Sequence, residues 1–275
     1  MPMTRRAVIK AALATTLGSA AGGVSYGMAF ERHWVEMTST PLSVAGLPPA
    51  LDGLRIGFIT DIHHSRLVPA ADVIRALDLA MSARPDLVVL GGDYVTYGDR
   101  AFVGPVAELL GSLRAPHGVF AILGNHDDDR DMPAALAGKG FVVLKDQRTE
   151  VSIRGEKLTL AGIRFWTRRT ASIASVLKGA ESSTTLLLAH DPRRLVQAAE
   201  LDVPAVLSGH THGGQVVLPG IGALARRRFP VLAGLGRRDG TTIFVSRGVG
   251  TVYVPVRINC PPEVAIVTLR RGSRV

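Results

Sequence analysis

Polar residues that can bind a metal ion follow five apolar segments of this 275-residue chain. In chain order, the five motifs are Asp61-Ile62-His63, Gly92-Asp93, Gly124-Asn125-His126-Asp127, His190-Asp191 and Gly209-His210-Thr211-His212. Carboxylates, imidazoles and an amide oxygen form a mixed ligand set that suits Mn²⁺, Fe, Zn²⁺ or Mg²⁺. The single cysteine, Cys260, excludes an intramolecular disulfide and a cysteine-based zinc site. The side-chain types therefore predict a metal centre built from oxygen and nitrogen ligands.

The spacing within two of the motifs favours shared binding of one cation. Alternate side chains of an extended segment point to the same side, so we expect Asp61 and His63 to face one ion together. The same alternation applies to His210 and His212. Each motif alone is weak evidence, because an aspartate at a strand end is more often a helix cap than a ligand. Their ordered combination within about 150 residues indicates a common site.

The apolar segments that precede these motifs alternate with helical periodicity in the first half of the chain. Strands are expected at 54–60, 86–90, 119–123 and 141–144, with helices at 70–82 and 102–113 and a helical turn at 133–137. The second half is β-rich, with strands at 151–153, 158–162, 184–189, 205–208, 215–218, 242–246 and 264–269 and a helix at 193–199. This order indicates an α/β chain with at least one mostly parallel sheet, whose strand carboxyl ends form the natural ligand crevice.

The ordered series Asp-x-His, Gly-Asp, Gly-Asn-His-Asp, His and Gly-His-x-His resembles the motif pattern of the calcineurin-like metallophosphoesterases. The resemblance extends over residues 54–269. The strings at 208–215, 246–250 and 262–263 are similar to an exported bacterial phosphodiesterase branch of that family. The resemblance implies a single domain at residues 53–275, folded as a four-layer α/β/β/α sandwich of two mixed sheets flanked by helices.

The resemblance also implies a role for each motif residue. Two divalent metal ions, from among Mn, Zn, Fe and Mg, are the implied cofactors. The first would be held by Asp61, His63 and His212, the second by Asn125, His190 and His210, and both by the bridging carboxylate of Asp93. A hydroxide between the ions would attack a phosphodiester or phosphoanhydride bond, and His126 would protonate the leaving oxygen.

Four residues near these motifs have two interpretations each. Asp127 is expected to cap a helix or, as the less favoured alternative, to orient the ring of His126. His64 lies on the other side of the extended segment from the ligands, so it would either contact substrate or support a ligand. Arg247 and Arg257 stand in strings shared with the branch, where each would hold a phosphate of the substrate or serve the structure.

The segment 164–169 departs from the family pattern, because an acidic stretch is usual there and Arg164, Arg168 and Arg169 stand in its place. This basic stretch would either favour more anionic substrates or form a surface loop without a role. Trp166, which lies among the arginines, would cover an acyl or sugar group or the edge of the core.

The first 29 residues have the features of a twin-arginine-type export signal or anchor. Arg5 and Arg6 stand in the string Thr4–Lys10, and a weakly apolar stretch at 11–23 follows. The alternative is a basic start before an ordinary amphipathic helix. Small residues at 27–29 permit cleavage, and residues 30–52 are expected to be a linker and first edge. We therefore expect export by the twin-arginine machinery to the periplasm, the cell wall or the outer face of the membrane.

The net charge of +9 favours anionic partners such as phosphate esters, acidic membrane lipids or cell-wall polymers, although it could serve solubility alone. Aromatic residues make up 5% of the chain, so binding of nucleic acid by stacking is not expected. A monomeric, metal-dependent phosphodiesterase fits these features best. The competing hypotheses are a diphosphatase for lipid precursors of the UDP-diacylglucosamine type and a metal-binding scaffold without catalysis.

Overall fold

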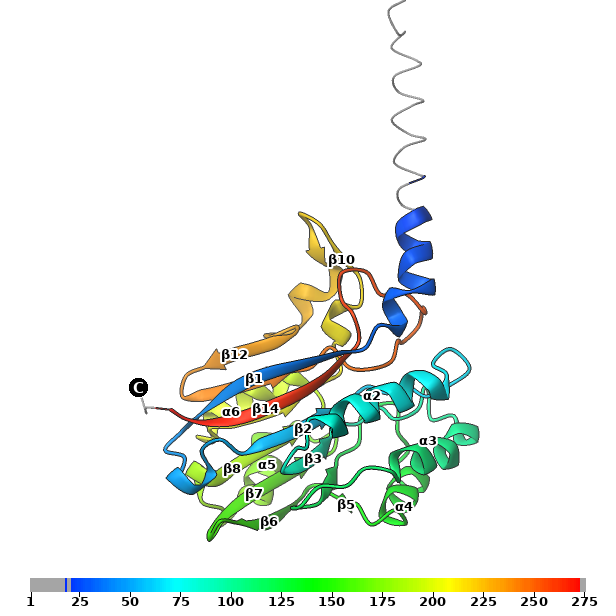
Figure 1. The fold of residues 1–275 in the computed structure, drawn as a ribbon. Coiled ribbons are helices and arrows are strands. Elements are labelled where there is room, and N and C mark those ends of the chain that lie inside the picture. Colours follow the sequence, from blue (N-terminus) through cyan, green and yellow to red (C-terminus); the bar gives the residue numbers. More distant parts are fainter. Residues whose placement is uncertain (1–17, 19–20, 273–275) are drawn as a thin grey trace, which may run out of the picture.

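Two six-stranded β-sheets form the centre of the protein, and helices cover their outer faces (Figure 1). The computed structural model describes residue 18 and residues 21–272. The first sheet has the strand order β1-β14-β2-β3-β4-β5, and the second has the order β12-β13-β9-β8-β7-β6. Both sheets are mixed, because runs of parallel strands are joined to antiparallel neighbours.

The motifs predicted from the sequence follow strands of both sheets. The first sheet consists of β1 (Glu36–Ala45), β2 (Arg55–Ile59), β3 (Leu87–Leu90), β4 (Val119–Ala121), β5 (Val142–Val143) and β14 (Glu263–Gly272). The second consists of β6 (Gln147–Ile153), β7 (Glu156–Ile163), β8 (Thr185–Ala189), β9 (Ala205–Ser208), β12 (Gly234–Arg238) and β13 (Thr241–Val245). A separate hairpin joins β10 (Val217–Leu218) to β11 (Gly222–Ala223).

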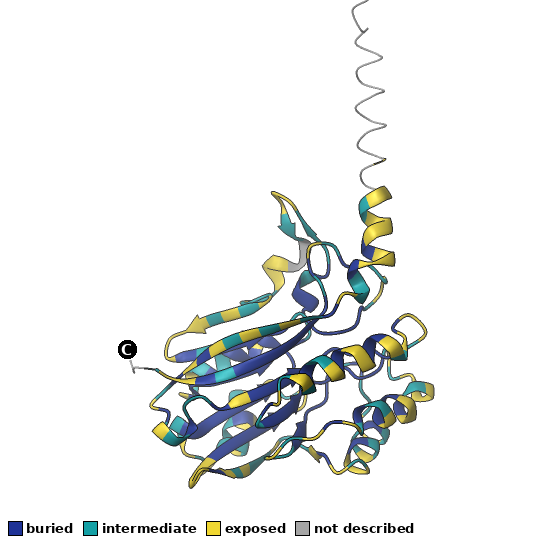
Figure 2. Cartoon of the chain, viewed as in Figure 1, coloured by how far each residue is buried: buried dark blue, intermediate teal, exposed yellow. Residues whose placement is uncertain are grey.

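The helices form the two outer layers of the sandwich. The first sheet is covered by α2 (Ala70–Ser82), α3 (Val103–Leu110) and α4 (Asp131–Ala137), and the second by α5 (Thr170–Leu177) and α6 (Leu195–Glu200). In α2, Val73, Ala76, Leu77 and Ala80 recur at helical spacing and are all buried. Figure 2 shows buried strands between helices whose outer faces are exposed.

Three apolar layers hold the four structural layers together, as β3 illustrates. Val88 and Leu90 pack beneath the helices of the first sheet, whereas Leu87 and Val89 fill the space between the two sheets. A strand that is buried on both faces needs apolar residues at every position, which explains its uninterrupted Leu-Val-Val-Leu sequence. The expected α/β/β/α sandwich of two mixed sheets flanked by helices is confirmed.

The sequence missed α5, β12 and the two-residue strand β11 in the second half because their local signals are weak. In α5, Ile173 is the buried residue, so the helix lacks a clear apolar stripe. Two glycines and two arginines occur in β12, a composition that disfavours strands, and its backbone pairs with β13. The strand expected at 215–218 is only the two-residue β10, because residues 212–214 form a 3₁₀ turn.

The segment before the first sheet is attached to the loop at 256–260. Residues 21–29 form a helix, and the twin-arginine motif lies outside the described residues. The carbonyl of Gly27 accepts a hydrogen bond from the backbone of Arg257 at 3.3 Å, and Glu31 accepts one from the backbone of Cys260 at 2.6 Å. The stretch expected as linker and first edge contains β1, the edge strand of the first sheet. No helix in the described ranges is long and apolar enough to span a bilayer.

Candidate metal centre

The five motifs meet in loops at one end of the sandwich. Three of the loops follow β2, β3 and β4 of the first sheet, and the other two follow β8 and β9 of the second. All five strands run in parallel within their sheets, so their carboxyl ends lie at one edge. The site is therefore built between the two sheets and needs both of them.

The backbone at this site is not extended, which corrects the alternation expected for the two paired motifs. Asp61 and His63 have positive φ angles of 53° and 50°, and His210 and His212 have positive φ angles of 72° and 52°. Asp93 has a φ angle of 55°. Left-handed backbone is uncommon outside glycine and is concentrated at functional sites. The side chains converge through tight turns, which the sequence pattern did not reveal.

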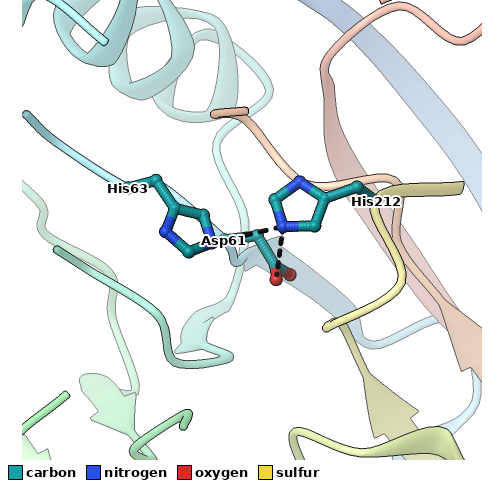
Figure 3. A group of neighbouring side chains, drawn as sticks. All are labelled: Asp61, His63 and His212. Atoms are coloured by element: carbon teal, nitrogen blue, oxygen red, sulfur yellow. Dashed lines mark hydrogen bonds and ion pairs between the residues drawn. The ribbon is translucent and has the colours of Figure 1, made fainter. Parts of the chain in front are cut away.

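The first group of side chains consists of Asp61, His63 and His212 (Figure 3). The Nε2 atom of His212 lies 3.4 Å from Oδ1 of Asp61 and 3.2 Å from Nε2 of His63. All three residues are buried. Two ring nitrogens and a carboxylate oxygen thus face one small volume, as ligands of a single cation do.

The second group consists of Asp93, His190 and His210, and its Asp93 also lies close to His63 of the first group. Oδ2 of Asp93 lies 3.1 Å from Nε2 of His190 and 3.5 Å from Nε2 of His63. His190 is also close to the first group, with its Nε2 3.8 Å from Oδ1 of Asp61. The carboxylate of Asp93 therefore stands between the two groups, at the position of a bridging ligand.

The hydrogen bonding and the protonation states of these side chains fit the binding of divalent cations. The Oδ1 atom of Asn125 is buried without a hydrogen-bond partner, a costly arrangement that a bound cation would relieve. Burial and the nearby Asp93 carboxylate raise the pKa of Asp61 to about 6, against the opposing effect of His190. Burial lowers the pKa of His63 to about 3, so its imidazole is neutral and available as a ligand.

The loops approach one another so closely that two positions facing the carboxylates must be glycine. A Cβ atom on Gly124 would overlap the carboxylate of Asp93, and one on Gly209 would overlap that of Asp61. The backbone N–H of His210, the next residue, donates to both carboxylate oxygens of Asp61 at 3.0 Å. These glycines let the backbone of one loop approach the ligands of another.

Asp127 has a role that neither interpretation of the sequence included. Its carboxylate accepts hydrogen bonds from the backbone N–H groups of Asp93, Tyr94 and Gly124 at 2.7, 2.8 and 2.9 Å. The expected helix cap falls one residue later, because Asp128 accepts hydrogen bonds from the backbone at the start of α4. Asp127 thus ties the loop after β3 to the loop after β4.

His126, the expected catalytic residue, lies outside the Asp61 group, but with His63 and Asp93 it forms a further cluster that could hold a metal ion. Its ring packs edge-on against the ring of His63 at 4.9 Å, and its Nδ1 accepts a hydrogen bond from the backbone N–H of Tyr97 at 3.0 Å. The proton of the neutral ring is therefore on Nε2. The rings of Tyr97 and Tyr253 flank His126 at 5.0 and 6.5 Å, and both tyrosines are exposed.

The three residues with a substrate-binding interpretation make structural contacts, which agrees with the second interpretation given for each. His64 is buried, and its Nδ1 contacts the carbonyl of Val68 at 2.9 Å. The guanidinium of Arg257 is fully buried and donates to backbone carbonyls of its own and neighbouring loops. Arg247 is half-buried and forms ion pairs with Glu36 at 3.0 Å and Glu263 at 3.5 Å.

Two phenylalanines that the sequence did not indicate form a wall of the second group. The ring of His210 lies 5.1 Å from the ring of Phe165 and 5.5 Å from that of Phe229. Phe165 belongs to the basic segment 164–169, so that segment borders the site. A search for apolar residues after β7 would have found Phe165, but only the tertiary structure brings it to His210.

Comparisons with known proteins give one consistent result. The family model for calcineurin-like phosphoesterases matches residues 54–214, which contain all five motifs. An uncharacterized metallophosphoesterase of Bacillus subtilis, YkuE, is 29% identical over 98% of this chain and 98% of its own length. Phosphodiesterase YaeI of Escherichia coli is 30% identical over 97% of this chain and 99% of its own length. An uncharacterized metallophosphoesterase of Aquifex aeolicus is 30% identical over 94% and 98%, respectively.

Proposed function

This chain belongs to the calcineurin-like phosphoesterase family, and on that premise we propose that it is a phosphodiesterase that uses two divalent metal ions. The observation that carries the proposal is the pair of ligand groups that meet at Asp93. Asp61, His63 and His212 would hold one ion, and His190, His210 and Asn125 the other. When bound, such ions activate water as a nucleophile and neutralise charge on the phosphoryl oxygens.

His126 acts on the leaving group in this proposal. The backbone N–H of Tyr97 occupies Nδ1, so the transferable proton is on Nε2. Burial lowers the pKa of His126, so the resting ring is neutral. A neutral imidazole does not give up its one N–H proton, so as general acid the ring first takes up a second proton. The imidazolium then donates the Nε2 proton to the oxygen that leaves as the ester bond breaks, and the ring returns to its neutral form.

A diester is a better substrate than a monoester because of what surrounds the ligand groups. The rings of Tyr97 and Tyr253 lie near His126, and those of Phe165 and Phe229 lie near His210, so aromatic rings border the ligand groups at both histidines. A diester has an organic group where a monoester has an additional charged oxygen. Aromatic rings make more favourable contact with the organic group than with the charged oxygen. The name of YaeI, a phosphodiesterase, supports the same choice.

We also propose that the protein is exported by the twin-arginine route and acts as a monomer in the cell envelope. Arg5 and Arg6 without a nearby acidic residue support export, and the net charge of +9 supports attraction to anionic lipids or cell-wall polymers. Fractionation of cells that carry the natural chain or an Arg5→Lys, Arg6→Lys variant tests the route. The variant should stay in the cytoplasm, and equal export of both chains would refute it.

The activity is tested by hydrolysis of bis(p-nitrophenyl) phosphate and p-nitrophenyl phosphate with metal-stripped protein. Mn²⁺, Zn²⁺, Fe²⁺ or Mg²⁺ is added back in turn, and Asp93→Asn serves as a variant without the shared ligand. Metal-dependent turnover that favours the diester and is lost in the variant supports the proposal. Turnover of a UDP-diacylglucosamine-type diphosphate alone would replace it with the diphosphatase function. Bound metal without turnover of any ester would make the protein a scaffold.

A further inference from the structure

A basic cavity lies next to the second ligand group, and the proposed function makes no use of it. It has a volume of about 520 Å³ and is lined by Trp166, Thr167, Arg168, Arg169 and Ser172, together with Asp146 and Arg164. Most of the lining comes from the loop between β7 and α5, the same segment that departs from the family pattern, while Ser172 lies in α5 and Asp146 just before β6. A departure in sequence thus coincides with a hollow beside the site.

The cavity is joined to the ligand groups through one aromatic side chain. The ring of Phe165 lies 5.1 Å from that of His210 and 4.7 Å from that of Trp166, so a single phenyl ring separates Trp166 from a proposed metal ligand. The backbone of the loop is held as well. Arg194 donates to the carbonyl of Arg168 at 3.4 Å and contacts Asp191, the neighbour of His190, at 3.3 Å.

The carboxylate in this cavity is already paired. Asp146 accepts hydrogen bonds from Nε of Arg164 and from the hydroxyl of Thr167, each at 2.7 Å. Arg164 also contacts Asp129 at 3.1 Å. The charge of Arg164 is thus offset by the carboxylates of Asp146 and Asp129. The net positive charge of the cavity therefore comes from Arg168 and Arg169.

Arg168 and Arg169 carry positive charge without an acidic partner. Among the residues that the structure describes, neither guanidinium has a carboxylate within 4.0 Å. The guanidinium of Arg168 lies over the ring of Trp166 at 5.1 Å and over that of Phe165 at 5.8 Å. The two rings are perpendicular to each other, so they hold the guanidinium from two sides, and its N–H groups have no acceptor among the described residues. The amino end of α5 begins at Thr170 and adds partial positive charge.

We propose that Arg168, supported by Trp166 and Arg169, binds a second phosphate group of the substrate while the first is at the ligand groups. The proposal rests on the proposed function and narrows its substrate to molecules that carry at least two phosphates. Arg168 offers a planar pair of donors that matches a phosphate, and the exposed ring of Trp166 covers the group between the phosphates. Both polymers of phosphodiester units and small bisphosphates have this chemistry.

The test measures inhibition of bis(p-nitrophenyl) phosphate hydrolysis by the metal-loaded protein. The inhibitors are α,ω-alkanediol bisphosphates of increasing chain length, and each is compared with the monophosphate of the same alcohol. We expect the bisphosphate to inhibit more strongly at one preferred length. Arg168→Gln should reduce that preference by about tenfold, the effect of losing a hydrogen bond between charged groups. The ratio of the two inhibition constants cancels any change at the ligand groups.

The control is Arg237→Gln, which removes the same charge from β12 at the other end of the second sheet. It should keep the full preference, whereas Trp166→Ala should lose part of it. Trp166 and Arg168 are exposed, so neither substitution threatens folding. An unchanged preference in Arg168→Gln overturns the second site and leaves the phosphodiesterase function intact.

Two further experiments cover a protein that hydrolyses no ester and the choice between a polymeric and a small substrate. If no ester is hydrolysed, calorimetric titration of the metal-loaded protein with the bisphosphate replaces inhibition. The same loss in Arg168→Gln then supports the site, and equal affinity refutes it. Tighter binding of a long glycerol phosphate polymer than of its dimer would indicate a polymeric substrate, whereas equal binding would indicate a small bisphosphate.

Discussion

The carboxylates of Asp93 and Asp127 join two loops of the site through reciprocal hydrogen bonds, each accepting from the backbone of the other loop. Oδ2 of Asp127 accepts a hydrogen bond from the backbone N–H of Asp93 at 2.7 Å. In return, Oδ1 of Asp93 accepts one from the backbone N–H of His126, next to Asp127, at 2.8 Å. Each of the loops after β3 and β4 thus binds the backbone of the other through a carboxylate, and these bonds fix the positions of Asp93 and His126.

Replacing Asp127 tests these hydrogen bonds. Asp127→Ala leaves three backbone N–H groups without their acceptor, so we expect the free energy of unfolding to fall by about 2 kcal/mol or more. Activity and metal affinity should fall with it, because Asp93 loses its fixed orientation. Denaturant unfolding and metal titration are the measurements. Asp99→Ala, which removes an exposed carboxylate with one backbone contact, is the control and should change stability by under about 1 kcal/mol.

His126→Ala tests the general-acid role through the leaving group. With an alkyl phosphodiester, the leaving alkoxide needs a proton, so we expect kcat to fall by about 10²–10⁴-fold. With a p-nitrophenyl ester the leaving oxygen is already stable as an anion, and the loss should be much smaller. Metal content must stay unchanged in the variant. Equal losses for the two esters would mean that His126 acts on the phosphoryl group instead.

The pH dependence of metal binding follows from His190. Burial alone would lower its pKa, but the carboxylates of Asp93 and Asp61 outweigh that effect and raise it to about 10. Below that pH the metal-free protein holds a proton on the ring, which a metal must displace. We therefore expect proton release on metal binding at pH 8, and an affinity that increases with pH.

Calorimetry in buffers of different ionisation enthalpy measures this release. An NMR titration of the metal-free protein supplies the control, since Asp93→Asn should shift the titration of His190 to lower pH. An unshifted titration would show that Asp93 is not the cause.

Arg257 should affect stability more than catalysis. Its guanidinium donates to the carbonyls of Gly250, Arg247 and Cys260 at 2.6, 2.8 and 3.0 Å, and a lysine cannot reach all three. We expect Arg257→Lys to lower the free energy of unfolding by about 3 kcal/mol. The matched change Arg247→Lys, in a half-buried ion pair, should cost about 1 kcal/mol or less. If Arg257→Lys is as stable as the natural protein but has a raised KM, the result would instead support the interpretation that Arg257 binds a phosphate of the substrate.

The attachment of the helix at residues 21–29 can be tested with two glycines of the same helix. A Cβ atom on Gly27 would overlap the carbonyl of Arg257, whereas one on Gly23 meets no atom within 4 Å. Gly27→Ala should therefore increase hydrogen exchange at 21–30, and Gly23→Ala should leave it unchanged or lower. Equal exchange in the two variants would mean that the helix is not held at Gly27. Cleavage after Ala29 would remove this contact but retain Glu31.

The sequence predicted the ligand set because the chemistry depends on residue types that are rare in this order. Asp61, His63, Asp93, His190 and His212 were expected from motifs at the ends of apolar segments, and the strands before them are apolar because both faces are buried. Alternation along an extended strand was the wrong reason for the pairing of Asp61 with His63 and of His210 with His212. The left-handed turns depend on hydrogen bonds from other loops, which no local pattern contains.

The roles of Asp127, Arg257 and Phe165 were decided by tertiary structure alone. An aspartate after a strand has the same local signal whether it caps a helix or clamps a distant loop, and an arginine in a shared string has the same charge whether exposed or buried. Burial and partner choice arise when segments far apart in the chain meet. The sequence by itself determined the fold class and which side chains gather at the candidate metal site. The tertiary structure decided which groups are held, which are free and what lies beside the site, because those properties depend on distances between loops of two separate sheets.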